Sequence, residues 1–161
     1  MTDKTQRFWD ILESMRVCMV TTQDGEVMRS RPMAPYISKL DRTIQFVTDS
    51  ESAKIYELRQ DQDIALSFVD ADSMVFVSVS GKGRVNRDRA RIREMWGPYC
   101  QVFFGDDPDS ADVAIIEVNA TQAEYWDNDK GKLSTAIEMT RAYFSDDGPN
   151  LGENEKLNLA G

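Results

Sequence analysis

The sequence predicts an α+β protein whose sheet is largely antiparallel and closes into a barrel. Seven strand-like runs occur along the chain, and the helical patterns lie at the ends and between strands instead of alternating with them as in a doubly wound fold. The length of 161 residues suits one domain, which buries roughly 70% of the surface that the unfolded chain exposes. Many short strands in a modest chain leave unpaired edges, and closure into a barrel removes them.

An amphipathic helix is expected first, because apolar residues recur at spacings of three and four over residues 5–15. Strand-like runs follow at residues 17–22 and 27–38, and the Asp24-Gly25 turn between them is a strong hairpin signal. A third strand is expected over residues 43–48.

The polar residues 49–52, DSES, are typical of a helix start and predict a helix that begins at Ala53. Two further strands are expected over residues 64–69 and 74–85. The SGKG at residues 80–83 indicates a bulge, a bend of the barrel, or close approach of the backbone to something flat.

The last third begins with a helical pattern over residues 87–96, which Gly97-Pro98 ends. Strands are then expected over residues 113–119 and 122–127. A second amphipathic helix is expected over residues 133–144.

The final segment is mostly Asp, Glu, Asn and Gly, so we expect a domain over residues 1–145 and a weakly held acidic tail over residues 146–161. The alternative is that Leu151, Leu157 and Leu159 dock over the barrel or over a partner subunit.

The net charge of −9 is unevenly placed. Residues 106–161 hold 13 acidic and 4 basic side chains, whereas residues 1–105 hold 15 of each. An acidic chain repels phosphate backbones and anionic lipids, so we expect neither nucleic-acid nor membrane binding. The arginines of RVNRDRARIR at residues 84–93 interleave with Asp88 and precede Glu94, which favours a solvated helix face over a nucleic-acid patch.

The absence of histidine and the small number of cysteines exclude several kinds of catalytic and metal site. The chain has no histidine, which excludes Ser-His and Cys-His nucleophile systems and His-ligated metals. Cys18 and Cys100 stand alone, so no disulfide framework, zinc site or other metal site is expected. No residue is identified as a catalytic acid or base, so most chemistry of an enzyme of this kind belongs to a cofactor. With neither a membrane helix nor a secretory signal, we expect a cytoplasmic protein.

Arg29 and Arg31 form the first candidate anion site. Their spacing of two places both guanidinium groups on one face of a strand, roughly 7 Å apart. Pro32 restricts Arg31 to extended geometry. The alternative is a pair of solvated arginines on an edge strand.

Residues 48–54 form the second candidate, because they offer the hydroxyls of Thr48 and Ser52, the ammonium of Lys54 and a helix N-terminus. The unpaired N–H groups and dipole of such an N-terminus favour a phosphate. Ordinary helix capping explains the same residues, and Asp49 and Glu51 oppose an anion unless they point away.

Aromatic residues are dense in one stretch. Core packing explains most of them, and a dimer interface or the edge of an aromatic cofactor would use the same residue types. The residues concerned are Trp96, Tyr99, Phe103, Phe104 and Trp126.

The order of these pieces resembles the pyridoxamine 5'-phosphate oxidase-like FMN-binding split barrels, and in particular their general stress protein subgroup. The resemblance covers most of the chain. The matching pieces are, in order, the opening helix, RPM at residues 31–33, FVT at 46–48, Ser52-x-Lys54, the strand ending VSVSGKG, the tryptophan-containing segment through GDDPD, and EYWD at 124–127.

The resemblance implies a homodimer of mostly antiparallel, six-stranded split β-barrels with flanking helices, which binds FMN in grooves between the subunits. Carried over to this chain, it assigns Arg31, Thr48, Ser52 and Lys54 to the flavin phosphate. Residues along the ribityl chain or the ring would be Pro32, Met33 and Val47. Arg29 and Trp126 are further residues expected near the cofactor.

The chain also departs from the oxidase itself. The glutamine that the oxidase has in a polar strand before the glycine is absent, since Phe76, Val77, Ser78 and Val79 stand there. The C-terminal arginine-histidine pattern is absent too, so oxidation of pyridoxamine phosphate is not expected. The function that the resemblance implies is an FMN-binding oxidoreductase acting on an unidentified small molecule. The alternative is a non-catalytic flavin-binding or flavin-free stress or interaction protein.

Overall fold

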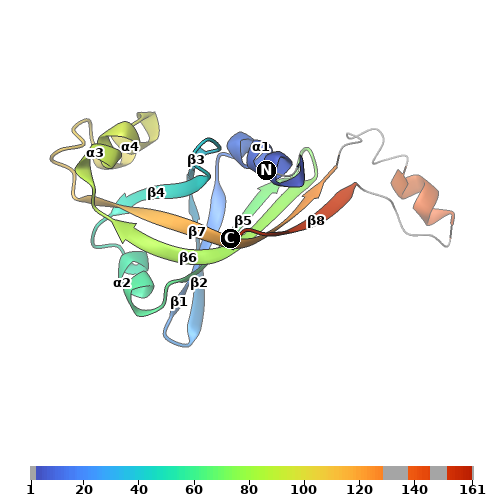
Figure 1. Cartoon of the computed structure of the whole chain (residues 1–161), viewed down its shortest axis with the longest axis horizontal. Coiled ribbons are helices and arrows are strands. Elements are labelled where there is room, and N and C mark those ends of the chain that lie inside the picture. The colour runs from blue at the N-terminus through green and yellow to red at the C-terminus, as the bar shows by residue number, and fades with distance from the viewer. Residues whose placement is uncertain (1–2, 129–137, 146–151, 161) are drawn as a thin grey trace.

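A computed structural model describes residues 3–128, 138–145 and 152–160 of the chain. Its strands form one antiparallel sheet in the order β2-β1-β5-β6-β7-β4-β3, with β8 paired to β7 (Figure 1). The strands are β1 (Cys18–Asp24), β2 (Val27–Met33), β3 (Tyr36–Ser38), β4 (Thr43–Asp49), β5 (Asp63–Asp70), β6 (Val75–Asn86), β7 (Val113–Asp127) and β8 (Glu153–Asn158). The expected α+β class with an antiparallel sheet is confirmed.

The described residues hold eight strands, compared with the seven runs that the sequence predicts and the six strands that the resemblance implies. The run expected over residues 27–38 is two strands, because Ala34-Pro35 separates β2 from β3 and proline cannot donate to a ladder. Conversely, the runs expected at 113–119 and 122–127 are one strand, β7. It continues past the register shift at Ser80/Gly81 of β6.

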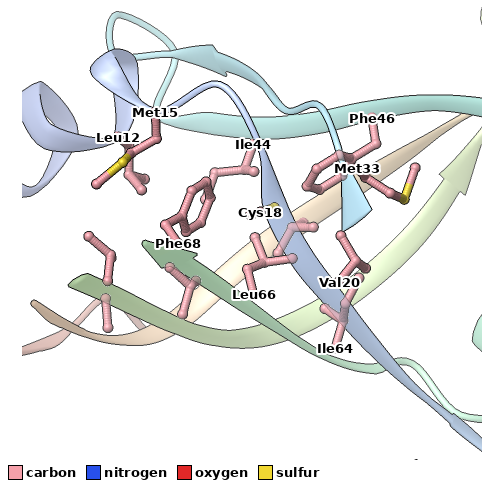
Figure 2. Close-up of a cluster of buried hydrophobic side chains, with 14 of the residues drawn as sticks. Leu12, Met15, Cys18, Val20, Met33, Ile44, Phe46, Ile64, Leu66 and Phe68 are labelled. Atoms are coloured by element: carbon pink, nitrogen blue, oxygen red, sulfur yellow. The ribbon is translucent and has the colours of Figure 1, made fainter. Parts of the chain in front are cut away.

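The sheet wraps around a core to which α1 (Asp3–Ser14) contributes its apolar face. Figure 2 shows Leu12 and Met15 meeting side chains from β1, β4 and β5 in this core. Helix α2 (Ala53–Gln60) packs beside β1 and β6, with Ile55 and Leu58 buried. The helix at 53–60 begins where the sequence predicted.

A second, smaller core lies where α3 (Arg89–Glu94) and α4 (Pro98–Phe104) pack on the outer side of β4 and β7. Helix α3 is shorter than the expected 87–96, because the Asp88 side chain accepts from the Ala90 N–H at 2.9 Å and caps it. Gly97 then opens α4. Of the expected helix over 133–144, residues 138–143 are helical and the start lies outside the described residues.

The glycines of β6 are explained by the protein itself. A Cβ at Gly81 would lie 2.2 Å from the backbone oxygen of Asn119, at the register shift. A Cβ at Gly83 would lie 2.7 Å from Cδ2 of Leu58 on α2. The bulge is therefore confirmed, and Gly83 is the point where α2 approaches the sheet.

The expectation of a weakly held tail is wrong for the end of the chain. Strand β8 pairs with β7 over residues 153–158, and Leu157 is buried in the main core with Leu159 packed against it. The alternative, in which these leucines dock over the barrel, is what the structure shows for Leu157 and Leu159. Leu151 lies outside the described residues. Two apolar side chains suffice here because an existing strand supplies the hydrogen-bond ladder.

The two edges of the sheet define a split. Among the described residues, β2 pairs only with β1, and β3 covers only residues 43–45 of β4. The candidate site lies between this open edge of β2 and α2, where Arg29 and Arg31 of β2 reach Glu57 of the helix.

Candidate functional site

Alternate residues of β2 point to the side that α2 covers. Met33 is buried in the main core, the Arg31 side chain is 20% exposed and the Arg29 side chain is 48% exposed. This gradient follows from the pleat, which places every second residue on one face. The strand therefore carries its two guanidinium groups from the core out to the rim, as their spacing predicted.

The side chains of both arginines donate to Glu57 of α2, whose carboxylate is buried. Arg29 Nη1 donates to Glu57 Oε1 at 2.9 Å, and Arg31 Nη2 donates to Glu57 Oε2 at 2.8 Å. Arg31 Nη1 also donates to the Thr22 hydroxyl at 2.5 Å, and that hydroxyl donates to Glu57 Oε2. Burial would raise the pKa of Glu57, but the hydrogen bonds from Thr22 and Arg31 and the charges of both arginines lower it below its usual value. Glu57 is therefore an anion.

The N-terminus of α2 is not capped by a side chain. Ser52 occupies the cap position, yet its hydroxyl lies 3.3 Å from the Thr48 hydroxyl and makes no capping bond. The two acids that opposed an anion are hydrogen-bonded within the protein: Asp49 accepts from the Glu51 N–H at 2.7 Å, and Glu51 accepts from the Tyr56 hydroxyl. Asp49 still lies near enough to Lys54 for its charge to raise the pKa of that lysine. The capping explanation for these residues is thus not what the structure shows.

Lys54 is half-buried and, among the described residues, makes no ion pair. Burial lowers the pKa of its ammonium from 10.5, and the nearby charge of Arg31 lowers it further, while Asp49 and Glu57 partly oppose this. Two cations close together, one of them without a counter-ion, make a local field that favours an anion.

The side chains of Arg31, Thr48, Ser52 and Lys54 thus belong to one end of the split, which we call the cationic cluster together with Arg29. Guanidinium, ammonium and hydroxyl donors are the groups that bind phosphate oxygens, and the uncapped helix start adds N–H donors. Glu57 pairs with both arginines and Asp24 also pairs with Arg29, so Lys54 is the cation of the cluster that makes no ion pair among the described residues. The residues present therefore fit a phosphate group.

A hollow of about 260 Å³ opens beside the cluster, between the β1–β2 turn and α2. Arg29 and Glu57 are among the residues that line it. The other lining residues are Gln23, Asp24, Gly25, Ala53, Tyr56 and Gln60.

Three residues expected near a cofactor lie differently. Pro32 is exposed on the face of β2 opposite to Arg31. The Val47 side chain packs in the second core, under α3 and α4, so only its backbone faces the split. Met33 lies in the main core next to the arginine face.

Trp126 is not brought to the cluster within one chain. Thr48 pairs with Ala114 at the start of β7, and Trp126 follows twelve residues later on the same strand, about 40 Å along an extended chain. Figure 1 shows that end of β7 beside β8, away from α2. There Trp126, 39% exposed, lines a hollow of about 150 Å³ with Met74 and Phe76.

Sequence reasoning missed Glu57 and Thr22, the two residues that fix the arginines. A signal was present for Glu57, since it lies between the apolar Ile55 and Leu58 on a short helix, where an acid needs a buried partner. Nothing in the sequence places Thr22 opposite Arg29 except the hairpin register.

Residues 3–128, 138–145 and 152–160 contain no group of three or more acids or cysteines arranged to hold a metal ion. No helix within those ranges is long and apolar enough to cross a membrane.

Among curated proteins, the chain is 29% identical to the Protein bli-3 of Neurospora crassa over 125 residues, 71% of this chain. The chain spans 60% of the length of that relative.

Solved structures share the fold. A general stress protein 26 from Jannaschia sp. CCS1 matches with a TM-score of 0.81 and 22% identity, over 98% of this chain and 99% of that one. A general stress FMN/FAD binding protein from Xanthomonas citri matches with a TM-score of 0.70 and 27% identity, over 81% and 94% of the chains.

The family model described as "Pyridoxamine 5'-phosphate oxidase like" matches residues 3–150, nearly the whole chain and every residue of the cationic cluster. The chain therefore belongs to the pyridoxamine 5'-phosphate oxidase-like family.

Proposed function

We propose that this protein binds FMN and acts as an oxidoreductase on a small molecule, with the flavin phosphate held by Arg31, Thr48, Ser52 and Lys54. The observation that carries the proposal is Lys54, a half-buried cation beside Arg31 that has no ion-pair partner among the described residues. The description of the Xanthomonas citri relative as an FMN/FAD binding protein supports a flavin as the phosphate-bearing ligand.

The residues of this chain bind and orient the cofactor in this proposal. Lys54 and Arg31 neutralise the phosphate, and the hydroxyls of Thr48 and Ser52 donate to its oxygens. Met33 and the backbone of Val47 would lie along the ribityl chain, whereas the Pro32 side chain points to the opposite face of β2, so only its backbone would meet the cofactor. The flavin supplies the electron transfer when bound.

We further propose a homodimer, because Trp126 lies too far from the cluster to meet the same FMN within one chain. Trp126 of the partner subunit would cover the flavin instead. Helix α4 supports association, since it exposes Tyr99, Val102 and Phe103, with 63% of Phe103 accessible. Light scattering at micromolar concentration should report twice the mass of the chain, and a monomer that still binds FMN tightly would contradict the shared groove.

The absorption spectrum of the purified protein, with titration of FMN and riboflavin, tests the cofactor. Flavin bands near one per subunit and tighter binding of FMN than of riboflavin are expected, because only FMN carries the phosphate. A colourless protein that ignores added FMN would establish the flavin-free alternative.

A further inference from the structure

We propose that Glu57 is a positioning residue of the phosphate site: it fixes the guanidinium groups of Arg29 and Arg31 so that their remaining donors serve the ligand. This inference rests on the proposed function and deepens it. It concerns a residue that would not itself touch the phosphate, since an anion repels an anion.

The burial of Glu57 makes its role specific. Its side chain is 4% exposed, and its two oxygens accept from three donors on two strands of the hairpin. An isolated buried carboxylate is costly, and this one is retained with both of its oxygens occupied by cations or a hydroxyl. Packing alone does not need it, because the neighbouring Ile55 and Leu58 already attach α2 to the sheet.

The hydrogen bonds of Arg31 show what this anchoring leaves available. A guanidinium has five N–H donors in a rigid plane. Arg31 uses one on Nη1, to Thr22, and one on Nη2, to Glu57. Two fixed bonds define the orientation of the plane, and the other three N–H groups have no partner in the described part of the chain. Arg31 is thus held for a ligand before the ligand arrives.

Thr22 completes the anchor. Its hydroxyl accepts from Arg31 and donates to Glu57, so the three groups form a closed ring of hydrogen bonds. Thr22 is almost fully buried, opposite Arg29 in the hairpin register. These hydrogen bonds join the β1–β2 hairpin to α2 at the phosphate site.

The Glu57→Gln variant distinguishes positioning of the arginines from simple repulsion between the Glu57 charge and the ligand. If Glu57 only opposed the ligand, removing its charge would tighten FMN binding, because the cluster would become more positive. If Glu57 positions the arginines, FMN binding weakens, because a Gln amide offers one acceptor where the carboxylate offers two. The two roles therefore predict opposite signs.

The experiment measures dissociation constants for FMN and riboflavin in the wild-type protein and in Glu57→Gln. We expect FMN affinity to fall by about tenfold, as for loss of one charge-assisted hydrogen bond, and riboflavin affinity to change by less than about twofold. Unchanged or tighter FMN binding would overturn the proposal. Equal losses for both ligands would also overturn it, since they would show a purely structural role.

Thr22→Val keeps the shape of the anchor and removes only the hydroxyl, so it carries the test if Glu57→Gln does not fold. A several-fold loss confined to FMN is expected, and no loss contradicts the proposal. Glu94→Gln is the matched control, because Glu94 pairs with Arg91 on α3 and should leave both ligands unaffected. In the double variant Arg31→Ala/Glu57→Gln, the losses should not add, because Glu57 acts through Arg31.

Stabilisation by inorganic phosphate separates this inference from the flavin proposal. If wild-type protein binds no flavin, the proposed function fails, but the rise of its Tm with added phosphate still reports the site. That rise should shrink in Glu57→Gln and persist in Glu94→Gln. An equal rise in all three proteins would overturn the role of Glu57 by itself.

Discussion

Two regions of this protein are rich in positive charge, and they use it differently. The cationic cluster at the split holds Arg29, Arg31 and Lys54. On α3 the arginines are closer together in the sequence, and each of them donates hydrogen bonds to acceptors within the described part of the protein. Arg89 donates to the backbone oxygens of Pro108 and Ala111, Arg91 to Gln45 and Glu94, and Arg93 to Asp109.

The difference lies in pairing: each α3 arginine has an acceptor in the protein, whereas the cluster at the split includes a lysine with no ion pair among the described residues. In α3 the arginines fasten the 105–112 connector and the second core. At the split, one buried carboxylate serves two arginines, and Lys54 has no ion pair among the described residues. The ammonium of Lys54 is the charge that a phosphate would neutralise.

The largest expected effect tests that contrast directly. Lys54→Ala and Arg31→Ala should each weaken FMN binding by roughly 10- to 150-fold, because each removes charge-assisted contacts worth about 1.5 to 3 kcal/mol. Riboflavin, which lacks the phosphate, should lose little. Titrations of both ligands measure the ratio, and equal losses would assign these side chains to the ring or to the fold.

The pH dependence of FMN binding sharpens the comparison, with a smaller effect. The pKa of Lys54 is lowered from 10.5, so its ammonium loses its proton at lower pH than an ordinary lysine. Loss of that charge removes an attraction to the phosphate, so FMN affinity should fall as the pH rises above neutrality toward 10. The expected fall is up to about tenfold relative to Lys54→Arg, whose guanidinium stays charged.

Lys54→Arg is the matched control, because any ionisation of the flavin itself affects both proteins alike. FMN affinities measured at several pH values in the two proteins give the difference. Parallel curves would show that the Lys54 ammonium is not part of the phosphate site.

Much of this site was predictable because its signals are local. The period of two places Arg29 and Arg31 on one face, and the polar residues before Ala53 mark the helix start, whatever the rest of the fold does. The positions of Glu57 and Trp126 were not predictable in the same way. They depend on which strand α2 packs against and on β7 being one continuous strand, and both are properties of tertiary pairing.

The tail shows the same limit. Residues 146–161 have the composition of a disordered segment, and composition is a sum over residues. Strand β8 forms because β7 offers an edge, and Leu157 then enters a core made by distant parts of the chain. Sequence patterns within the tail contain no information about that edge.

The smallest expected effect lies in the other cationic region. Arg93 pairs with Asp109 at 2.6 Å, but both side chains are 54% exposed, and exposed ion pairs contribute about 0 to 1 kcal/mol. Arg93→Ala should therefore leave the Tm nearly unchanged and alter the affinities for FMN and riboflavin by less than about twofold. Thermal unfolding and the same two titrations measure this. A loss of FMN binding comparable to that of Lys54→Ala would show that total positive charge attracts the phosphate, and the distinction between the ion-paired arginines of α3 and Lys54 would then be wrong.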